Sequence, residues 1–129
     1  MTPERYEQGR KKLAAMSGTS VDAMLGKFSD IAPDLARFTV EFPYGDVLSR
    51  PGLDLRSRQI ATVAALTALG NAAPQLHAHV DMALNVGCSR QEIVEVITQM
   101  AVYAGFPAAL NGMTVAKEVF RERDTKGLS

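Results

Sequence analysis

Cysteine is almost absent from this 129-residue chain, which contains Cys88 alone. A single cysteine allows no disulfide within the chain and no Cys-x-x-Cys redox pair, which fits a reducing compartment and argues against a dithiol mechanism. Cys88 lies at a predicted turn between two helices, so we interpret it as an incidental small residue.

The chain also lacks an excess of charge and a long apolar run. Its 14 basic residues balance its 14 acidic residues, so it has no electrostatic footprint for nucleic acid or for an anionic membrane. No apolar stretch is long enough to cross a bilayer, and the N-terminal MTPERYEQGRKK is charged where a signal peptide is apolar. These absences predict a cytoplasmic protein with no nucleic-acid and no membrane partner. The length and composition fit one domain over residues 1–129.

Strand signals are missing as well, because valine and isoleucine recur only at helical spacing. The sequence therefore predicts an all-α fold. An N-cap at Thr2 begins the first predicted helix, and a capping box of Ser89 and Glu92 begins the sixth. The predicted helices span about 3–16, 20–29, 33–42, 55–69, 74–86, 90–103 and 108–123, with a loop over 43–54 and a frayed tail after 123.

The predicted helix over 55–69 is apolar on nearly every side. A helix of this kind is normally buried all round. A chain this short cannot easily surround one of its own helices, so we predict that part of this surface meets another subunit.

The most informative residue is an imidazole within an apolar helical stripe, in the run QLHAHVDMALNVG from Gln75 to Gly87. At about 100° per residue, His79 falls inside the apolar arc, with Gln75 beside it one turn earlier. His77 falls at the polar edge, one turn from Asp81, which is the spacing of an exposed ion pair. We predict that His79 lies in a low-dielectric place where its proton affinity can be tuned. The alternative is a core histidine that a backbone carbonyl or Gln75 satisfies.

A helical metal site is excluded for the two histidines. His77 and His79 are two residues apart and point roughly 200° away from each other on a helix, whereas helical ligand pairs lie four apart. No Gly-x-Ser-x-Gly nucleophile motif and no phosphate-binding glycine loop is present. We therefore expect no metal and no cofactor.

The interpretation that remains from composition and spacing is a small pocket that excludes water and contains one proton-carrying residue. His79 would carry the proton, and Gln75 would orient it or donate to a substrate oxygen. Arginines can receive carboxylates through paired hydrogen bonds, although a solvated helix start with surface ion pairs is the alternative for each. The tyrosine and arginine candidates for completing the pocket are Tyr44, Tyr103, Arg50, Arg56 and Arg58.

Four stretches together resemble the carboxymuconolactone decarboxylase family, within the alkylhydroperoxidase D-like superfamily. They are YGDVLSRPGLDLRSRQIATVAALTALG, QLHAHVDMALNVG, EIVEVITQMAVYAGFPAALNG and AKEVF, in order from Tyr44 to Phe120. The resemblance implies an alkylhydroperoxidase D-like helical bundle that forms a homo-oligomer, commonly a trimer or a hexamer of paired subunits. It also implies that His79 is the histidine that both branches of the superfamily place on this helix.

The resemblance also separates two chemistries. The peroxidase-like branch has a Cys-x-x-Cys pair where this chain has Ala72 and Gln75, so a thiol relay would have no thiols. The decarboxylase branch often has a glutamate at the place of Gln75, and Gln59 stands about where a glutamate of the superfamily's proton relay falls. A carboxy-lyase is favoured over a redox protein, and a non-catalytic oligomeric ligand-binding protein is the other alternative.

For such a lyase, the resemblance implies decarboxylation of 4-carboxymuconolactone in the β-ketoadipate route of aromatic catabolism. Loss of CO2 leaves electrons that spread through the butenolide double bond onto the lactone carbonyl, so the substrate is its own electron sink. The protein must supply a dry pocket, a donor to the oxyanion and a general acid. We expect His79 as the acid, Gln75 or Tyr103 as the oxyanion donor, and Arg50 or Arg56 as the anchor of the second carboxylate.

Overall fold

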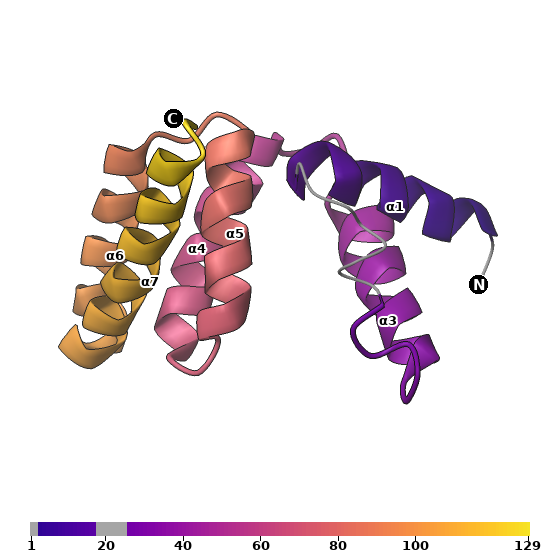
Figure 1. Cartoon of the computed structure of the whole chain (residues 1–129), viewed down its shortest axis with the longest axis horizontal. Helices are drawn as coiled ribbons and strands as arrows, with labels where there is room; N and C mark the ends of the chain where they lie inside the picture. The colour runs from indigo at the N-terminus through magenta and orange to yellow at the C-terminus, as the bar shows by residue number, and fades with distance from the viewer. Residues whose placement is uncertain (1–2, 18–25) are drawn as a thin grey trace. The chain divides into compact units, whose positions relative to one another are not determined.

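The computed structural model describes residues 3–17 and 26–129, and the described part is helical with no strand, which confirms the predicted all-α fold (Figure 1). The chain divides into two compact units, Met1–Asp54 and Leu55–Ser129, which we describe separately. No helix among the described residues combines the length and the apolar character needed to span a bilayer.

Unit 1 consists of α1 (Pro3–Ser17) and α3 (Pro33–Val40), and α3 continues directly into the π-helix η1 (Glu41–Val47). The helices predicted to end near residue 16 and to begin at residue 33 are confirmed. The predicted N-cap Thr2 lies outside the described residues, as does most of the predicted helix over 20–29. The described end of that helix, residues 26–29, forms turns and a bend instead.

The predicted loop over 43–54 is wrong in its first part, because η1 extends helical structure to residue 47. Glycine and proline usually mark turns, but here glycine serves helix packing. A Cβ on Gly45 would lie 2.6 Å from the carbonyl oxygen of Arg5, and one on Gly9 would lie 2.3 Å from that of Val40. Only glycine allows backbones to approach so closely. The sequence signal for a turn was therefore a signal for a tight helix crossing.

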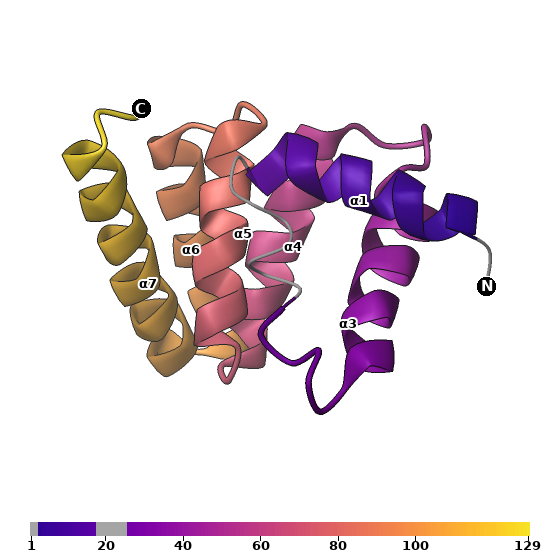
Figure 2. The ribbon, with the colours of Figure 1, turned by 45° about the vertical axis from the view of Figure 1, so that its right-hand side comes forward.

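Unit 2 is a bundle of four helices that run alternately up and down (Figures 1 and 2). The helices are α4 (Leu55–Leu69), α5 (Ala73–Asn85), α6 (Arg90–Ala104) and α7 (Phe106–Thr125). All four agree with the predicted helices to within a few residues. The predicted capping box is confirmed, since Ser89 Oγ accepts from the Glu92 amide at 3.0 Å and Glu92 Oε1 accepts from the Ser89 amide at 2.8 Å.

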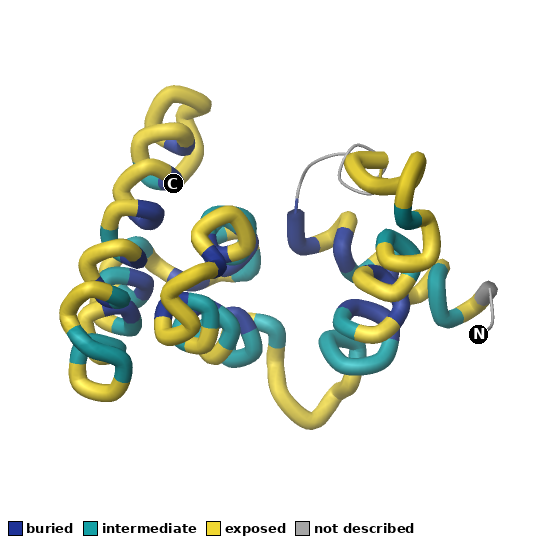
Figure 3. Tube along the Cα trace, turned by 90° about the horizontal axis from the view of Figure 1, so that it is seen from below, coloured by how far each residue is buried: buried dark blue, intermediate teal, exposed yellow. Residues whose placement is uncertain are grey.

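The core of unit 2 is built from one buried stripe of each helix, and Figure 3 shows buried and exposed positions alternating along the chain. Its buried members are Val63, Leu76, Val80, Ala83, Cys88, Ile93, Ile97, Val115, Ala116 and Val119. Part of α4 stays exposed in the single chain, as expected for a helix that this chain is too short to surround, and its contact with another subunit stays a prediction. Its outer face is mostly alanine, and Leu69 at its end is 64% exposed.

The predicted fraying of the C-terminal tail is also wrong. Arg123, only 5% exposed, donates from Nε to the carbonyl oxygen of Ser129 at 2.8 Å. The amide of Leu128 donates to the carbonyl oxygen of Arg123 at 2.8 Å, and Arg90 Nη2 donates to that of Leu128 at 3.2 Å. A buried guanidinium requires acceptors, and the tail supplies them.

Candidate functional site

His79 lies on α5, where the sequence predicted it, among side chains that face the core. Its neighbours Leu76, Val80 and Ala83 are buried. Burial disfavours the charged imidazolium and lowers the pKa of His79 to about 4. The imidazole is therefore neutral at neutral pH, in agreement with the predicted low-dielectric position.

The hydrogen-bond partner of His79 is Gln59 on α4. The Nδ1 of His79 lies 3.0 Å from the Oε1 of Gln59. In this orientation of the Gln59 amide its carbonyl oxygen accepts, which places the proton on Nδ1 and leaves the lone pair on Nε2. Gln59 is fully buried, and within the described residues its Nε2 has no hydrogen-bond partner. One end of the amide thus orients the imidazole while the other end remains a buried, unused donor.

Gln75, which the sequence suggested as the residue that orients His79, does not bond to it in the described part of the chain. It is exposed on the first turn of α5. Gln59 reaches His79 because α4 packs against α5. A signal for this was present, since Gln59 lies on the same helical row as Val63 and Thr67, and all three are buried.

The other predicted residues of unit 2, Arg56 and Tyr103, do not bond to this pair in the part of the chain that the structure describes. Arg56 forms an ion pair with Glu92, the residue that closes the α6 capping box, and its carbonyl oxygen lies 3.7 Å from the Cys88 sulfur. Tyr103, near the end of α6, is 79% exposed. Among the described residues, neither side chain makes a hydrogen bond to His79.

Two predicted site residues belong to unit 1. Tyr44 lies on η1 and is 8% exposed, and burial raises the pKa of its hydroxyl to about 12. Its hydroxyl is therefore neutral and remains a donor across the physiological range. Arg50 follows η1 in an exposed segment.

The predicted ion pair of His77 with Asp81 is wrong. His77 Nε2 instead lies 2.9 Å from Glu122 Oε2 on α7, and Asp81 pairs with Arg123 Nη1 at 2.6 Å. Both partners come from the helix that packs against α5, which local spacing within α5 cannot reveal.

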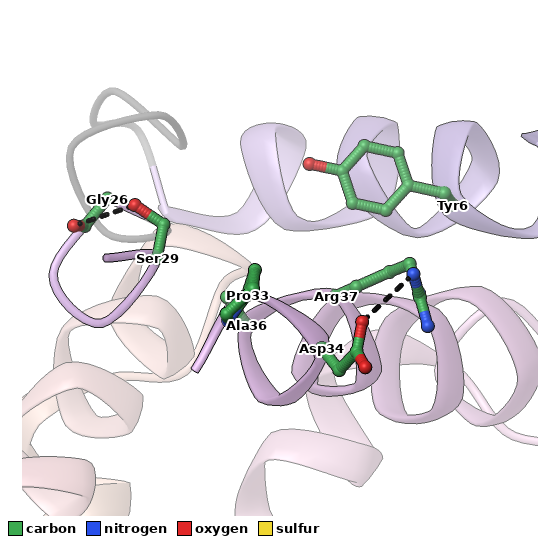
Figure 4. A pocket seen from close by; sticks show the side chains of 7 residues that line it. All are labelled: Tyr6, Gly26, Ser29, Pro33, Asp34, Ala36 and Arg37. Atoms are coloured by element: carbon green, nitrogen blue, oxygen red, sulfur yellow. Dashed lines mark hydrogen bonds and ion pairs between the residues drawn. The ribbon is translucent and has the colours of Figure 1, made fainter. Parts of the chain in front are cut away.

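Two hollows, one in each unit, are not lined by His79. Figure 4 shows the one in unit 1, about 470 Å³, where Asp34 and Arg37 form an ion pair of 3.2 Å. It is lined by Tyr6, Gly26, Ser29, Pro33, Asp34, Ala36 and Arg37. One of about 440 Å³ in unit 2 lies between α4 and α6 and is lined by Ile60, Ser89, Gln91, Glu92, Glu95 and Val96. Neither contains a histidine or a cysteine, so the pair of His79 and Gln59 remains the candidate site.

Comparison with known proteins places these observations in a family. The model of the carboxymuconolactone decarboxylase family matches residues 33–118. The chain is 35% identical over 120 residues to 4-carboxymuconolactone decarboxylase of Acinetobacter baylyi, covering 92% of this chain and 89% of that protein. It is 35% identical over 95 residues to an uncharacterized 15.0 kDa protein of Paracoccus denitrificans, covering 73% of this chain and 71% of that one. It is 33% identical over 88 residues to nitrosuccinic acid decarboxylase of Metarhizium robertsii, covering 67% of this chain and 60% of that one. The chain therefore belongs to the carboxymuconolactone decarboxylase family.

Proposed function

We propose that this chain is a carboxy-lyase that decarboxylates a small carboxylated lactone of the 4-carboxymuconolactone type, with His79 delivering the proton. The observation that carries the proposal is the contact of 3.0 Å between His79 and the buried Gln59, in a chain of this family. Two relatives, named 4-carboxymuconolactone decarboxylase and nitrosuccinic acid decarboxylase, support carboxy-lyase chemistry.

The reaction requires one bond to break and one proton to be placed. The bond between the ring carbon and the carboxylate breaks, CO2 leaves, and the electron pair moves through the ring double bond onto the lactone carbonyl. A proton then bonds to carbon and restores the neutral lactone. Because the substrate holds the electron pair itself, the protein has to exclude water, stabilise the oxyanion and supply the proton.

The lowered pKa of His79 implies that the substrate must help to charge it. With a pKa of about 4, the imidazole of the free protein is almost wholly neutral at pH 7. A carboxylate within about 4–6 Å favours the imidazolium and raises a pKa by roughly 1–3 units. Binding of the anionic lactone would therefore raise the protonated fraction of His79 at pH 7 from about one in a thousand to at most about half. The proton would lie on Nε2, the nitrogen that the contact with Gln59 leaves free.

Gln59 is proposed to have two parts in this reaction. Its Oε1 fixes the tautomer and the orientation of His79, and its unused Nε2 would donate to a substrate oxygen. An unpaired buried amide costs roughly 1–3 kcal/mol, and a substrate oxygen at this place would remove that cost. For the substrate's second carboxylate we keep Arg50 and Arg56 as candidates, and Arg56 would have to exchange Glu92 for the substrate.

Self-association is proposed as well, because one end of unit 2 leaves large apolar side chains in solvent. The α4–α5 and α6–α7 connections lie at the same end of the bundle (Figure 1). The exposed residues near these connections are Leu69, Val102, Tyr103, Phe106 and Leu110, each more than 60% exposed. We call them the apolar end, and a second copy of the chain would cover it and withdraw Tyr103 from solvent.

The proposal is tested with freshly generated 4-carboxymuconolactone, by following its ultraviolet absorbance and the release of CO2. We expect turnover by the wild type and a loss of about a hundredfold or more in His79→Ala, with the helical circular dichroism unchanged. Gln91→Ala, an exposed change on α6, is the control and should keep full activity. Absence of turnover in the wild type would reject this substrate, and turnover of His79→Ala within tenfold of the wild type would reject the role of His79.

A further inference from the structure

A second cluster of ionisable side chains lies between α5 and α7, separate from the pair of His79 and Gln59. It consists of His77, Glu118 and Glu122, and one ligand atom of each lies within 4.8 Å of the other two. Glu118 and Glu122 are one turn apart on α7, and His77 Nε2 is 2.9 Å from Glu122 Oε2. We propose that these three side chains bind a divalent transition-metal ion of the Zn²⁺ class.

The donor set fits such an ion. Imidazole nitrogen and carboxylate oxygen are ordinary ligands of Zn²⁺, at about 2.0–2.2 Å from the metal. Ligand atoms in a tetrahedral shell of that radius lie about 3.4 Å apart. Bringing atoms that now lie within 4.8 Å of one another to that separation needs side-chain movements of at most about 1.4 Å. A fourth position is left for water. Ca²⁺ and Mg²⁺ prefer six or more oxygen ligands, so this set selects against them.

The charges around the cluster also favour a cation. Two carboxylates four residues apart on one helix repel each other. The ion pairs among the described residues do not include Glu118. Arg123, which lies next to Glu122 in the sequence, is held by Asp81 at 2.6 Å and by Asn85 at 3.0 Å. Metal ligands bind in their deprotonated forms, so the two carboxylates of the bound set would balance the charge of a dication.

The position of the cluster makes it accessible while it remains anchored. The side chains of His77 and Glu122 are 35% and 45% exposed, so an ion can reach them from solvent. Their helices pack against each other in the core of unit 2. A bound metal would therefore fasten α5 to α7 only two residues from His79, whether or not His79 is catalytic.

The test uses metal-free full-length protein with Zn²⁺ for thermal unfolding and Co²⁺ for visible absorption. At a Zn²⁺ concentration a hundred times the dissociation constant, we expect the melting temperature to rise by roughly 5–10 °C. Co²⁺ should give the visible bands of an ion bound to nitrogen and oxygen. Glu118→Gln and His77→Asn should each weaken binding at least tenfold. Glu95→Gln, which removes the same charge from an exposed position on α6, should bind as the wild type does.

Three results would overturn the proposal. They are no thermal shift and no Co²⁺ spectrum in the wild type, equal affinity of Glu118→Gln and Glu95→Gln, and an equal stabilisation by Ca²⁺, which would indicate an unselective acidic surface. Glu118 is exposed, so Glu118→Gln should keep the fold and decides the question even if His77→Asn is unstable. The readouts are independent of decarboxylation, so a failure here leaves the proposed function standing.

Discussion

Acidification should destabilise this protein through His79, by an amount that follows from its burial. The pKa of His79 is about 4 in the folded chain, against an ordinary value of 6.5. Between these values the unfolded chain binds a proton that the folded chain does not bind. The contribution of His79 to stability is therefore complete above pH 6.5 and falls as the pH drops towards 4. A difference of about 2.5 units corresponds to roughly 3 kcal/mol in the free energy of unfolding.

The assay is urea unfolding followed by circular dichroism at several pH values from 4 to 7.5. Wild type and His79→Gln are compared at one protein concentration, because an association equilibrium would make stability depend on concentration. Carboxylates titrate in both chains and cancel in the difference. We expect the wild type to lose roughly 3 kcal/mol more than His79→Gln between pH 7 and pH 4. An NMR titration of the imidazole, assigned with His77→Gln, should give a midpoint near 4 for His79.

Parallel stability curves for the two chains would refute this reasoning. So would an NMR midpoint of His79 near 6.5, because it would show that the imidazole is hydrated in the folded protein. In either case the lowered pKa of His79, from which we infer that the substrate must help to charge the imidazole, would have no basis.

Two further changes test the contact at the site and the apolar end. Gln59→Glu places a carboxylate beside Nδ1 of His79 and should raise the pKa of His79 by roughly 1–3 units in the same NMR titration. An unchanged midpoint would mean that the two side chains do not meet. Phe106→Glu puts a charge into the apolar end and should lower the mass measured by light scattering. Gln91→Glu adds the same charge at the start of α6, away from the apolar end, and should leave the mass unchanged. Equal masses for the two variants would contradict the proposed self-association.

The helices of unit 2 could be predicted because their boundaries have local signals. The capping box at Ser89 fixes the start of α6, and Gly87 and Gly105, with φ of 107° and 94°, stand at the ends of α5 and α6. The π-helix η1 could not be predicted in this way. Gly45 has the same local appearance in a turn as in a close helix crossing, and only contact with α1 distinguishes the two.

The site shows the same division between local and tertiary information. The periodicity of α5 was enough to place His79 on the apolar face, and its lowered pKa agrees with that prediction. The partner of His79 lies 20 residues earlier, on another helix, so reasoning along α5 suggested Gln75 instead of Gln59. The partner of His77 was missed for the same reason, because Glu122 comes from α7. Helical spacing indicates which face a residue occupies, and helix packing decides what that face meets.

A neutral amide at position 59 determines what kind of acid His79 would be. A carboxylate there would stabilise the imidazolium in the empty site, and the proton would then be held by the protein before and after the reaction. Gln59 orients the ring without charging it, so the imidazolium would depend on the negative charge of the substrate. Departure of CO2 leaves the electron pair, and with it the negative charge, on the substrate as a dienolate beside the imidazolium. Proton transfer from Nε2 to the ring carbon would cancel that charge and return the imidazole to its neutral state. The product would carry one negative charge fewer than the substrate and would favour the imidazolium less.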